Sequence, residues 1–250
     1  TPRILLDAGP GAFLRIGELN IDLQHVDTVL LTHLHIDHSA GLAAFFNDRA
    51  LTSDGPITYR IFGPDGAGLF PKTTRFVDLL VGAGGAFPYQ KTFGADETFN
   101  VRDLAIALDS PRTKIVDEGG LVVEEIATHH DDCPSVAYRI SYRGVTVVFS
   151  GDMDASALPN LVQLAKNADL LVFNCAVLDP PGSPPQLYAL HTPPKKIGEA
   201  ARASGVKSLL LSHLAPDIEG REDAVRKSIR ASFAGPIAFA SDKERVPVGK

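Results

Sequence analysis

The sequence VDTVLLTHLHIDH occupies residues 26–38. Its first seven residues form an unbroken β-type run, typical of a strand that is buried on both faces. His33 and His35 are two residues apart on extended chain, so their side chains point the same way and can share one metal. Asp37 and His38 follow at an expected helix start, where they can turn toward a second metal. Three histidines and one aspartate directly after a buried strand predict a metal site.

Strands and helices alternate along the rest of the chain. Strands are expected at residues 57–63, 121–127, 135–142, 145–150, 170–174, 206–211 and 237–240. Helices are expected at residues 39–48, with Ser39 as N-cap, and at 70–80, 158–167, 193–204 and 222–233. Residues 64–100 give the weakest pattern. The alternation favours an α/β layered sandwich, and we expect residues 1–250 to form one domain.

Composition excludes several classes of protein. Hydrophobic residues make up 44% of the 250 residues and no apolar run is long enough for a membrane helix, so the chain is globular. Two cysteines are too few for a disulfide framework. The net charge of −6 disfavours nucleic acid and anionic membranes as partners. The chain starts at Thr1 without an initiator methionine or a signal peptide, so we expect the gene product to extend upstream, and the compartment stays open between cytoplasm and periplasm.

Further candidate ligands follow other expected strands. His129 and His130 come just after one strand, Asp152 follows another in a Ser-Gly-Asp sequence, and His213 follows a third. Open α/β folds bind ligands at the carboxyl ends of their strands. Because these side chains all stand at such ends, we expect them to contribute to the same metal site.

The stretch His33-Leu34-His35-Ile36-Asp37-His38 resembles the His-x-His-x-Asp-His signature of the metallo-β-lactamase superfamily. The resemblance covers nearly the whole chain. It implies a four-layer αββα sandwich with a dinuclear metal centre, here lacking the first one or two N-terminal strands of the family. It implies two zinc ions, with manganese or iron as alternatives. The implied ligands are His33, His35 and His130 for one ion, Asp37, His38 and His213 for the other, and Asp152 as the bridge.

Two of these assignments rest on local similarity alone. The stretch Cys133-Pro134-Ser135-Val136-Ala137-Tyr138 resembles a family segment that places the ligand at His130 rather than His129. Asp7, in Leu6-Asp7-Ala8-Gly9, resembles a residue that supports the metal ligands from behind through hydrogen bonds.

Such a centre predicts a hydrolase. Two cations that hold a water between them lower the pKa of the water and polarise the scissile group, so hydroxide attacks without a protein nucleophile. Asp37 is expected to orient that hydroxide as well as to bind metal. His191 precedes Thr192 and resembles a His-Ser/Thr element of the ribonuclease Z-like branch, which makes it our candidate for protonating the leaving group.

The signature favours one branch of the superfamily. Asp152 argues against true β-lactamases, and the residues after His38 depart from glyoxalase II, whereas the pattern resembles ribonuclease Z, arylsulfatases and cyclic phosphodiesterases. Only 22 residues separate His130 from Asp152, with no room for the tRNA-clamping arm of the long-armed nuclease, and residues 174–177 replace a His-Glu-Ala-Thr element. We therefore expect a small phosphodiester or related ester as substrate. The alternatives are a lactonase or weak β-lactamase, or a catalytically idle metal-binding partner protein; a homodimer is left open.

Overall fold

The chain forms two compact units, each containing one β-sheet. The computed structural model describes residues 2–92 and 95–249. One unit contains the residues up to Ala105 together with Asp132–Pro134, and the other contains Ile106–Asp131 and the residues from Ser135 onward. Over the described residues, the strands form a first sheet of four strands and a second sheet of seven.

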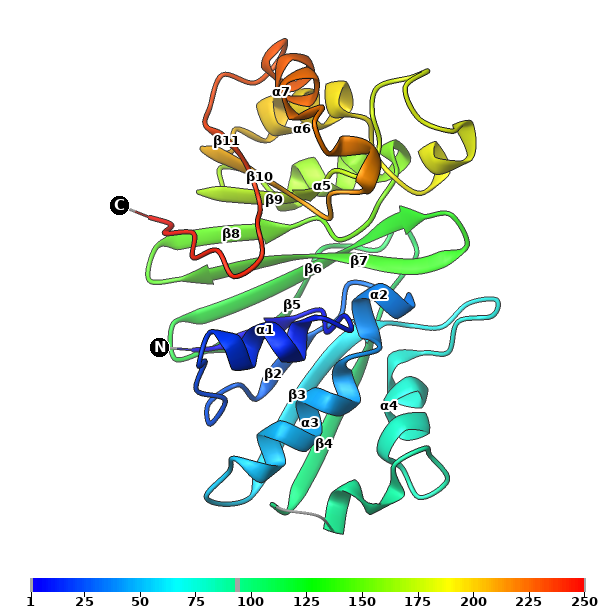
Figure 1. The fold of residues 1–250 in the computed structure, drawn as a ribbon, viewed down its shortest axis with the longest axis vertical. Coiled ribbons are helices and arrows are strands. Elements are labelled where there is room, and N and C mark those ends of the chain that lie inside the picture. Colours follow the sequence, from blue (N-terminus) through cyan, green and yellow to red (C-terminus); the bar gives the residue numbers. More distant parts are fainter. Residues whose placement is uncertain (1, 93–94, 250) are drawn as a thin grey trace. The chain divides into compact units, whose positions relative to one another are not determined.

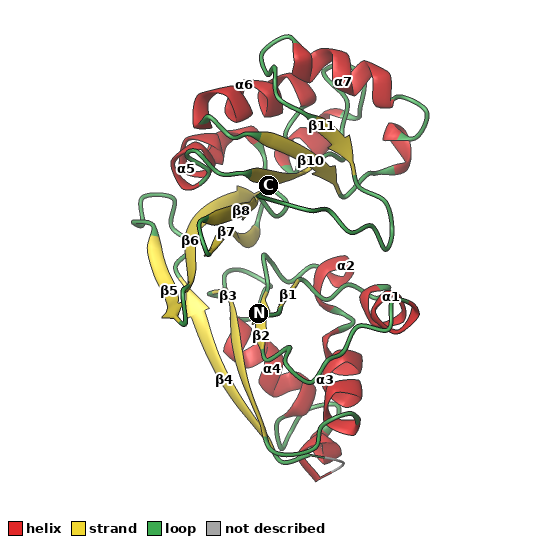
Figure 2. Ribbon diagram, turned by 90° about the vertical axis from the view of Figure 1, so that its left-hand side faces the viewer, coloured by secondary structure: helices red, strands yellow, loops and turns green. Residues whose placement is uncertain are grey.

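The first unit contains a parallel sheet in the order β1-β2-β3-β4. The strands are β1 (Ile4–Leu6), β2 (Thr28–Leu30), β3 (Ile57–Pro64) and β4 (Glu97–Leu104), and the helices are α1 (Ala12–Glu18), α2 (Ile36–Ser39), α3 (Leu42–Leu51), α4 (Thr73–Val81) and the 3-10 helix η1 (Pro88–Thr92). Helices α3 and α4 lie along this sheet (Figure 2). Phe45 and Phe46 of α3 pack against Tyr59 of β3 in a buried aromatic core, which fixes the helix on the sheet.

The second unit contains the second sheet, in the order β11-β10-β9-β8-β7-β6-β5, except that the first two residues of β7, Cys133 and Pro134, belong to the first unit. Its strands are β5 (Thr113–Glu118), β6 (Leu121–His130), β7 (Cys133–Tyr142), β8 (Val145–Phe149), β9 (Leu170–Asn174), β10 (Ser208–Ser212) and β11 (Ile237–Phe239). Its helices are α5 (Leu158–Leu164), α6 (Pro194–Ser204) and α7 (Glu222–Arg230), with the 3-10 helices η2 (Ala155–Ala157), η3 (Pro185–Ala189) and η4 (Pro216–Ile218).

Alternating residues of the second sheet face different cores. Leu171 and Phe173 of β9 pack with residues of α5, α6 and α7, which lie on one side of β9–β11 (Figure 1). Leu170 and Val172 point to the other face and pack in a separate apolar cluster with Val248 near the C-terminus. Because successive side chains of a strand point to opposite faces, the continuous run Leu170–Asn174 can be buried throughout.

The prediction that one helix starts at Ser39 and covers residues 39–48 is wrong. The segment forms two helices, α2 and α3, with Gly41 between them. Ser39 does not cap a helix; its hydroxyl donates to the carbonyl oxygens of Leu34 and His35. The break has a tertiary cause, because the Gly41 N–H donates to the Ala8 carbonyl oxygen at 2.7 Å, a long-range bond that local pattern cannot predict.

The α/β class predicted from the sequence is confirmed by the two sheets and their helices. That residues 1–250 form a single domain stays a prediction. Within the described part of the chain, no helix has both the length and the hydrophobicity that a membrane crossing requires.

Candidate metal centre

The first cluster comprises His33, His35, Asp37 and His38, which follow β2. The loop that carries it is held by backbone contacts with residues 7–9: the Ala8 N–H donates to the His38 carbonyl oxygen at 2.6 Å. A Cβ atom on Gly9 would stand 2.1 Å from the Asp37 carbonyl oxygen. Only glycine fits there, so the Gly-containing turn after β1 is what lets the ligand loop approach the sheet so closely.

Asp7 is the hydrogen-bond acceptor that orients the first cluster. Its Oδ1 accepts the Thr32 N–H at 2.7 Å, and its Oδ2 accepts the Thr32 hydroxyl and the His38 Nδ1–H, each at 2.8 Å. Because the hydroxyl hydrogen of Thr32 goes to Asp7, Thr32 Oγ1 accepts from His33 Nδ1, which lies 3.0 Å away. One carboxylate thereby sets which ring nitrogen carries the hydrogen in two histidines.

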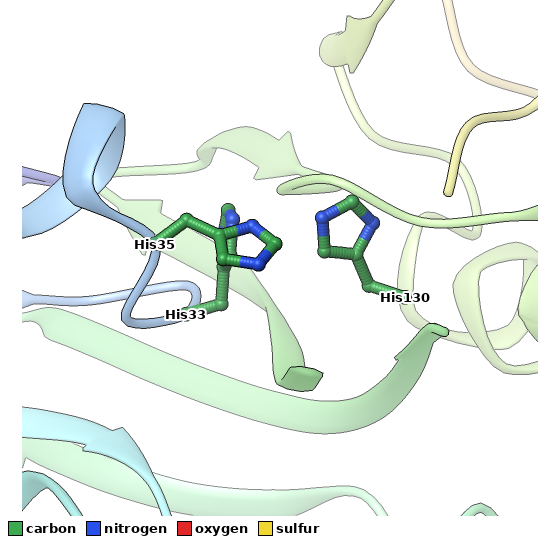
Figure 3. Close-up of side chains that lie close together, drawn as sticks. All are labelled: His33, His35 and His130. Atoms are coloured by element: carbon green, nitrogen blue, oxygen red, sulfur yellow. The ribbon is translucent and has the colours of Figure 1, made fainter. Parts of the chain in front are cut away.

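The imidazole rings of the first cluster lie against one another. The His33 ring centroid is 4.8 Å from that of His35 and 4.0 Å from that of His38. The rings of His33 and His35 both extend from the loop that follows β2 (Figure 3). Phe70 packs edge-on against His35 at a centroid distance of 5.4 Å. Asp37 differs from its neighbours, because 64% of its side-chain surface is exposed, and its carboxylate lies 3.6 Å from His38 Nε2.

The second cluster comprises His130, Asp152, His191 and His213. His130 is the last residue of β6 (Figure 3), Asp152 follows β8, His213 follows β10, and His191 precedes α6. The ligand atoms of His130, Asp152 and His191 lie within 4.8 Å of one another, and all three residues are buried. The His213 Nε2 atom is 3.3 Å from Asp152 Oδ2. Strand ends therefore bring together side chains that are far apart in the sequence.

Two backbone features support the second cluster. The His130 Nδ1–H donates to the Leu190 carbonyl oxygen at 2.7 Å, which turns the opposite nitrogen, Nε2, toward the cluster. His213 has a φ of +51°, in the left-handed region that non-glycine residues rarely adopt. The chain leaves β10 with a sharp turn at this residue, and the backbone conformation is part of what directs the ring.

His129 takes no part in the second cluster. Its Nδ1 lies 2.7 Å from Asp154 Oδ2, and Asp154 in turn accepts the Ser156 N–H at the start of η2. Successive residues of β6 point to opposite faces, so only one of the two adjacent histidines can face Asp152. The structure brings His130 to that position.

Sequence reasoning missed Asn174 as a component of the second cluster. This residue ends β9 and its Nδ2 lies 2.8 Å from His191 Nδ1. Its position at the carboxyl end of a buried strand, shared with the other members, was the available signal. The neighbouring Cys175 lies outside the ligand-type groups that the described residues form, and burial raises the pKa of its thiol to about 12.

Comparison with known proteins identifies the family. Residues 2–214 match the beta-lactamase superfamily domain. The chain belongs to the metallo-β-lactamase superfamily. Within it the chain resembles the ribonuclease Z branch: it is 27% identical to ribonuclease Z of Mycobacterium avium (strain 104) over 98% of this chain and 87% of that protein. It is 28% identical to ribonuclease Z of Mycobacterium sp. (strain KMS), over 98% of this chain and 85% of that protein.

Solved structures of the superfamily share the fold. The short form of human tRNase Z superposes with a TM-score of 0.74 at 19% identity, covering 99% of this chain and 88% of that one. The metallo-β-lactamase fold protein YhfI from Bacillus subtilis superposes with a TM-score of 0.70 at 23% identity, covering 96% and 85%. The predicted metallo-β-lactamase sandwich is thus confirmed, and membership of this superfamily, with ribonuclease Z relatives, makes the chain a metal-dependent hydrolase.

The comparisons correct one expectation. A small-molecule ester was expected as substrate and nucleic acid was disfavoured, but the curated relatives that span 98% of the chain are ribonucleases. The error lies in the use of net charge. The net charge of −6 is a sum over the whole chain. A phosphate group, in contrast, is bound by nearby cations, and these can include metal ions at the site.

Proposed function

We propose that the chain is a dinuclear, metal-dependent phosphodiesterase that hydrolyses RNA. The proposed ligands are His33, His35 and His130 for one ion, Asp37, His38 and His213 for the other, and Asp152 as the bridge. Zinc is the expected metal, because imidazole and carboxylate ligands suit it, with manganese or iron as alternatives. The observation that carries the proposal is the orientation of the histidine rings.

The ring orientations fit metal ligation. In His33, His38 and His130 the Nδ1–H donates to a fixed acceptor, respectively Thr32 Oγ1, Asp7 and the Leu190 carbonyl oxygen. A neutral imidazole with its hydrogen on Nδ1 has its lone pair on Nε2, which is the atom that ligates a metal. A hydrogen bond from the second ring nitrogen to a carboxylate or carbonyl is the usual support of a histidine ligand. His129 has the same kind of support from Asp154, so the arrangement supports metal ligation only together with the gathering of ligand atoms at the strand ends.

The chain's own residues can complete hydrolysis at such a centre. Divalent ions held by these residues would supply a water acidified enough to attack at neutral pH and would polarise the phosphate. In the reaction a bond forms between the water oxygen and phosphorus while the ester P–O bond breaks. The exposed Asp37 carboxylate orients the water and accepts its proton, and the leaving alkoxide takes a proton from His191.

RNA is the substrate class that the relatives support. Ribonuclease Z proteins align with 98% of this chain at 26–28% identity, so the similarity includes the loops around both clusters and not only the signature. The second candidate, hydrolysis of a lactone or lactam, is disfavoured by Asp152, since lactam-hydrolysing members generally lack an aspartate bridge.

The test is metal analysis combined with a substrate panel. The purified chain is loaded with zinc or manganese and assayed with a precursor tRNA carrying a 3′ extension, bis(p-nitrophenyl) phosphate, a p-nitrophenyl sulfate, a lactone and nitrocefin. We expect two metals per chain and cleavage of the RNA and of the phosphodiester. Turnover of the lactone or nitrocefin alone would replace the proposal with the second candidate. Less than one metal per chain, with no turnover after metal addition, would eliminate a hydrolase.

A variant pair separates the centre from the rest of the surface. Asp37→Ala should abolish turnover while the fold is retained, as judged by circular dichroism and thermal unfolding. Asp54→Ala removes another exposed carboxylate of the first unit, one that accepts only from Gln24 among the bonds described, and should stay active. A fully active Asp37→Ala variant contradicts the assigned role.

A further inference from the structure

The turn between β3 and α4 contacts the first cluster. It comprises residues 65–71 and forms a narrow loop that projects from the first unit (Figure 1). The Phe70 ring meets the His35 ring edge-on, at a centroid distance of 5.4 Å. Leu69, the residue before it, is 94% exposed, the highest value for a large hydrophobic residue in the part of the chain that the structure describes. The turn therefore presents an apolar side chain to solvent one residue away from a contact with a proposed metal ligand.

Local geometry fixes the conformation of the 65–71 turn. The Phe70 N–H donates to the Ala67 carbonyl oxygen at 2.9 Å, and the same two residues pair as an isolated antiparallel bridge. Between them Gly68 has a φ of +56°, in the left-handed region that glycine adopts at no steric cost. Leu69 lies inside this closed turn, so its backbone has a defined position.

The 65–71 turn is also anchored at both ends. At its start the Asp65 N–H donates to the Leu104 carbonyl oxygen of β4 at 2.8 Å. Just past its end the hydroxyl of Thr73, a buried residue, donates to the Pro64 carbonyl oxygen at 2.9 Å. A rearrangement that buried Leu69 against the first unit would disturb these bonds. The exposure of Leu69 is therefore a property of the folded turn.

The ligand loop of the first cluster contributes a second exposed apolar side chain. Ile36 lies between His35 and Asp37 and is 76% exposed. Single exposed hydrophobic residues are common on protein surfaces and carry no implication by themselves. Ile36 and Leu69 differ from such cases, because each is the sequence neighbour of a residue that belongs to the first cluster or contacts it. Apolar side chains therefore adjoin the place where His35 would hold a metal.

The composition of the turn indicates which part of an RNA it can contact. Residues 66–71 read Gly-Ala-Gly-Leu-Phe-Pro and carry no charged side chain. Because the RNA backbone is bound mainly by cations, these residues have nothing that attracts a phosphate. The faces of the bases are apolar, and they are accessible where the strand is unpaired. An uncharged turn beside a centre that cleaves RNA therefore fits an unpaired base.

We propose that Leu69 is a specificity-determining residue whose side chain packs on the face of the unpaired base next to the scissile phosphate. This inference rests on the proposed function, in which the metals beside His35 bind that phosphate. Because an apolar contact carries no hydrogen-bond code, the turn should accept every base and prefer the larger purines. Phe70 is a positioning residue that holds the turn against His35.

The contact is tested by RNA binding without turnover. The scissile position of a stem-loop RNA with an unpaired 3′ extension is first mapped with the unmodified chain. Affinities are then measured by fluorescence anisotropy with the metal-loaded Asp37→Ala chain, which the proposed function makes inactive. Adding Leu69→Ala should weaken binding by about 5- to 30-fold, because most of the apolar contact is lost.

Leu51→Ala is the matched control in the same Asp37→Ala chain. Leu51 is another exposed leucine of the first unit, at the end of α3, and it is 55% exposed. Its substitution should change RNA affinity by less than about twofold. Both leucine variants should keep the thermal stability of the chain that carries Asp37→Ala alone. Equal losses of RNA affinity in both variants overturn the proposal.

Abasic RNAs identify the group that Leu69 contacts. The base on the 5′ side or on the 3′ side of the scissile phosphate is removed in turn, while the sugar-phosphate backbone is kept. Removing the contacted base should weaken binding about as much as Leu69→Ala does. Combining the two changes should then add less than about a further twofold, since both remove the same contact. If Leu69→Ala weakens binding equally for the complete RNA and for both abasic RNAs, the proposal is overturned.

The remaining outcomes are distinguishable. If Leu69→Ala converts a dimer to a monomer in sedimentation and leaves RNA binding unchanged, a second copy of the chain covers Leu69 and the proposal is overturned. If the unmodified chain neither binds nor cleaves RNA, the proposed function and this inference both fail. RNA cleavage without coupling between Leu69 and either base removes this inference alone.

Discussion

The two clusters are supported in different ways. In the first, the single carboxylate of Asp7 accepts three hydrogen bonds and orients both His38 and, through Thr32, His33. In the second, two histidines each have a partner of their own: the Leu190 carbonyl oxygen for His130 and the Asn174 amide for His191. Two of the four members of the first cluster therefore depend on one residue, whereas His130 and His191 are supported separately.

The same contrast appears along the sequence. The first cluster lies within residues 33–38, so a single loop delivers it and one backbone contact can displace all of it. The second is drawn from residues 130–213, so several strands must form before its members meet. A substitution that displaces the loop of the first cluster should therefore disturb several of its side chains together. A substitution in the second cluster should disturb only the side chain that it supports.

The largest expected effect comes from removing a proposed ligand, His130, of the second cluster. His130→Ala should lower metal content and slow turnover of bis(p-nitrophenyl) phosphate by at least about 100-fold, because removing a metal ligand usually costs more than removing a residue that supports one. The measurements are metal stoichiometry and turnover of bis(p-nitrophenyl) phosphate. His129→Ala is the control: this neighbour pairs with Asp154 and should stay within about twofold of the unmodified chain. Equal losses in both variants would contradict the assignment of His130.

The collective character of the first cluster is tested by Asp7→Asn. Asparagine tolerates the φ of +53° at this position, so the backbone is preserved, but the amide cannot accept from all three donors. Metal affinity should fall by about 10- to 100-fold. Competition with a chelator measures the affinity, and histidine ¹⁵N spectra should show changes at both His33 and His38. Changes confined to His38 would contradict the expectation that Asp7 orients both histidines.

The backbone support of the first cluster is tested by adding one methyl group. Gly9→Ala places a Cβ against the Asp37 carbonyl oxygen and should cost about 2 kcal/mol of the free energy of unfolding, together with weaker metal binding. Gly11→Ala is the control, because a Cβ there meets nothing within 4 Å. Denaturant titration compares the two. A Gly9→Ala variant as stable as Gly11→Ala would contradict the prediction, because it would mean that the loop moves away from the added Cβ atom at little cost.

The smallest effect concerns a carboxylate in the second unit that lies outside the cluster. The Lys207 ammonium and the Thr146 N–H lower the pKa of Asp169 below its ordinary value. A lowered pKa stabilises the fold above the unfolded-state value and loses that contribution as the pH falls through the folded-state value. Asp169→Asn should therefore lower the free energy of unfolding by about 1 kcal/mol at neutral pH. The difference in stability between the variant and the unmodified chain should narrow as the pH falls below about 4.

Unfolding measurements between about pH 7 and about pH 3 check this prediction. The metal content of Asp169→Asn should remain unchanged, because the residue lies before β9, whereas the cluster residues follow the strands. A difference in stability that widens toward acid would contradict the assigned pKa direction.

The second sheet was largely predictable because its strands carry local signals. The apolar run Leu170–Asn174 is β9 with the bounds predicted. Arg143 and Gly144, expected as a tight hairpin turn, both have positive φ, +50° and +82°, as the primed turns of hairpins require. Gly205 ends α6 in the left-handed conformation that favours glycine.

Strand β4 was missed because its pattern depends on tertiary contacts. It opens with Glu97, a residue that argues against a buried position, yet only 5% of Glu97 is exposed. The Tyr59 hydroxyl and the Gln90 amide donate to its carboxylate, at 3.0 and 3.1 Å. A buried acid is tolerated where such donors exist, and no local window of sequence reveals them.

The same limit applies to the candidate site. Ligand-type residues were recognisable because histidine and aspartate at strand ends are chemically conspicuous. Their partners were not: the acceptor for His130 is a backbone carbonyl 60 residues away, which leaves no trace in residue identity. Asn174 ends a strand like the ligands, but an amide alone does not indicate which side chain it will face.

The membership of Asp132–Pro134 in the first unit affects how the chain can be made. When the ribosome has synthesised the residues up to Ala105, that unit still lacks this segment. By the time Pro134 is added, β5 and β6 also exist, but the strands that continue the second sheet do not. A lone hairpin is marginally stable, and its open edge invites pairing with other chains. We expect a fragment that ends at Pro134 to carry the β5–β6 hairpin without the strands that cover its edge, and therefore to aggregate more readily than the whole chain.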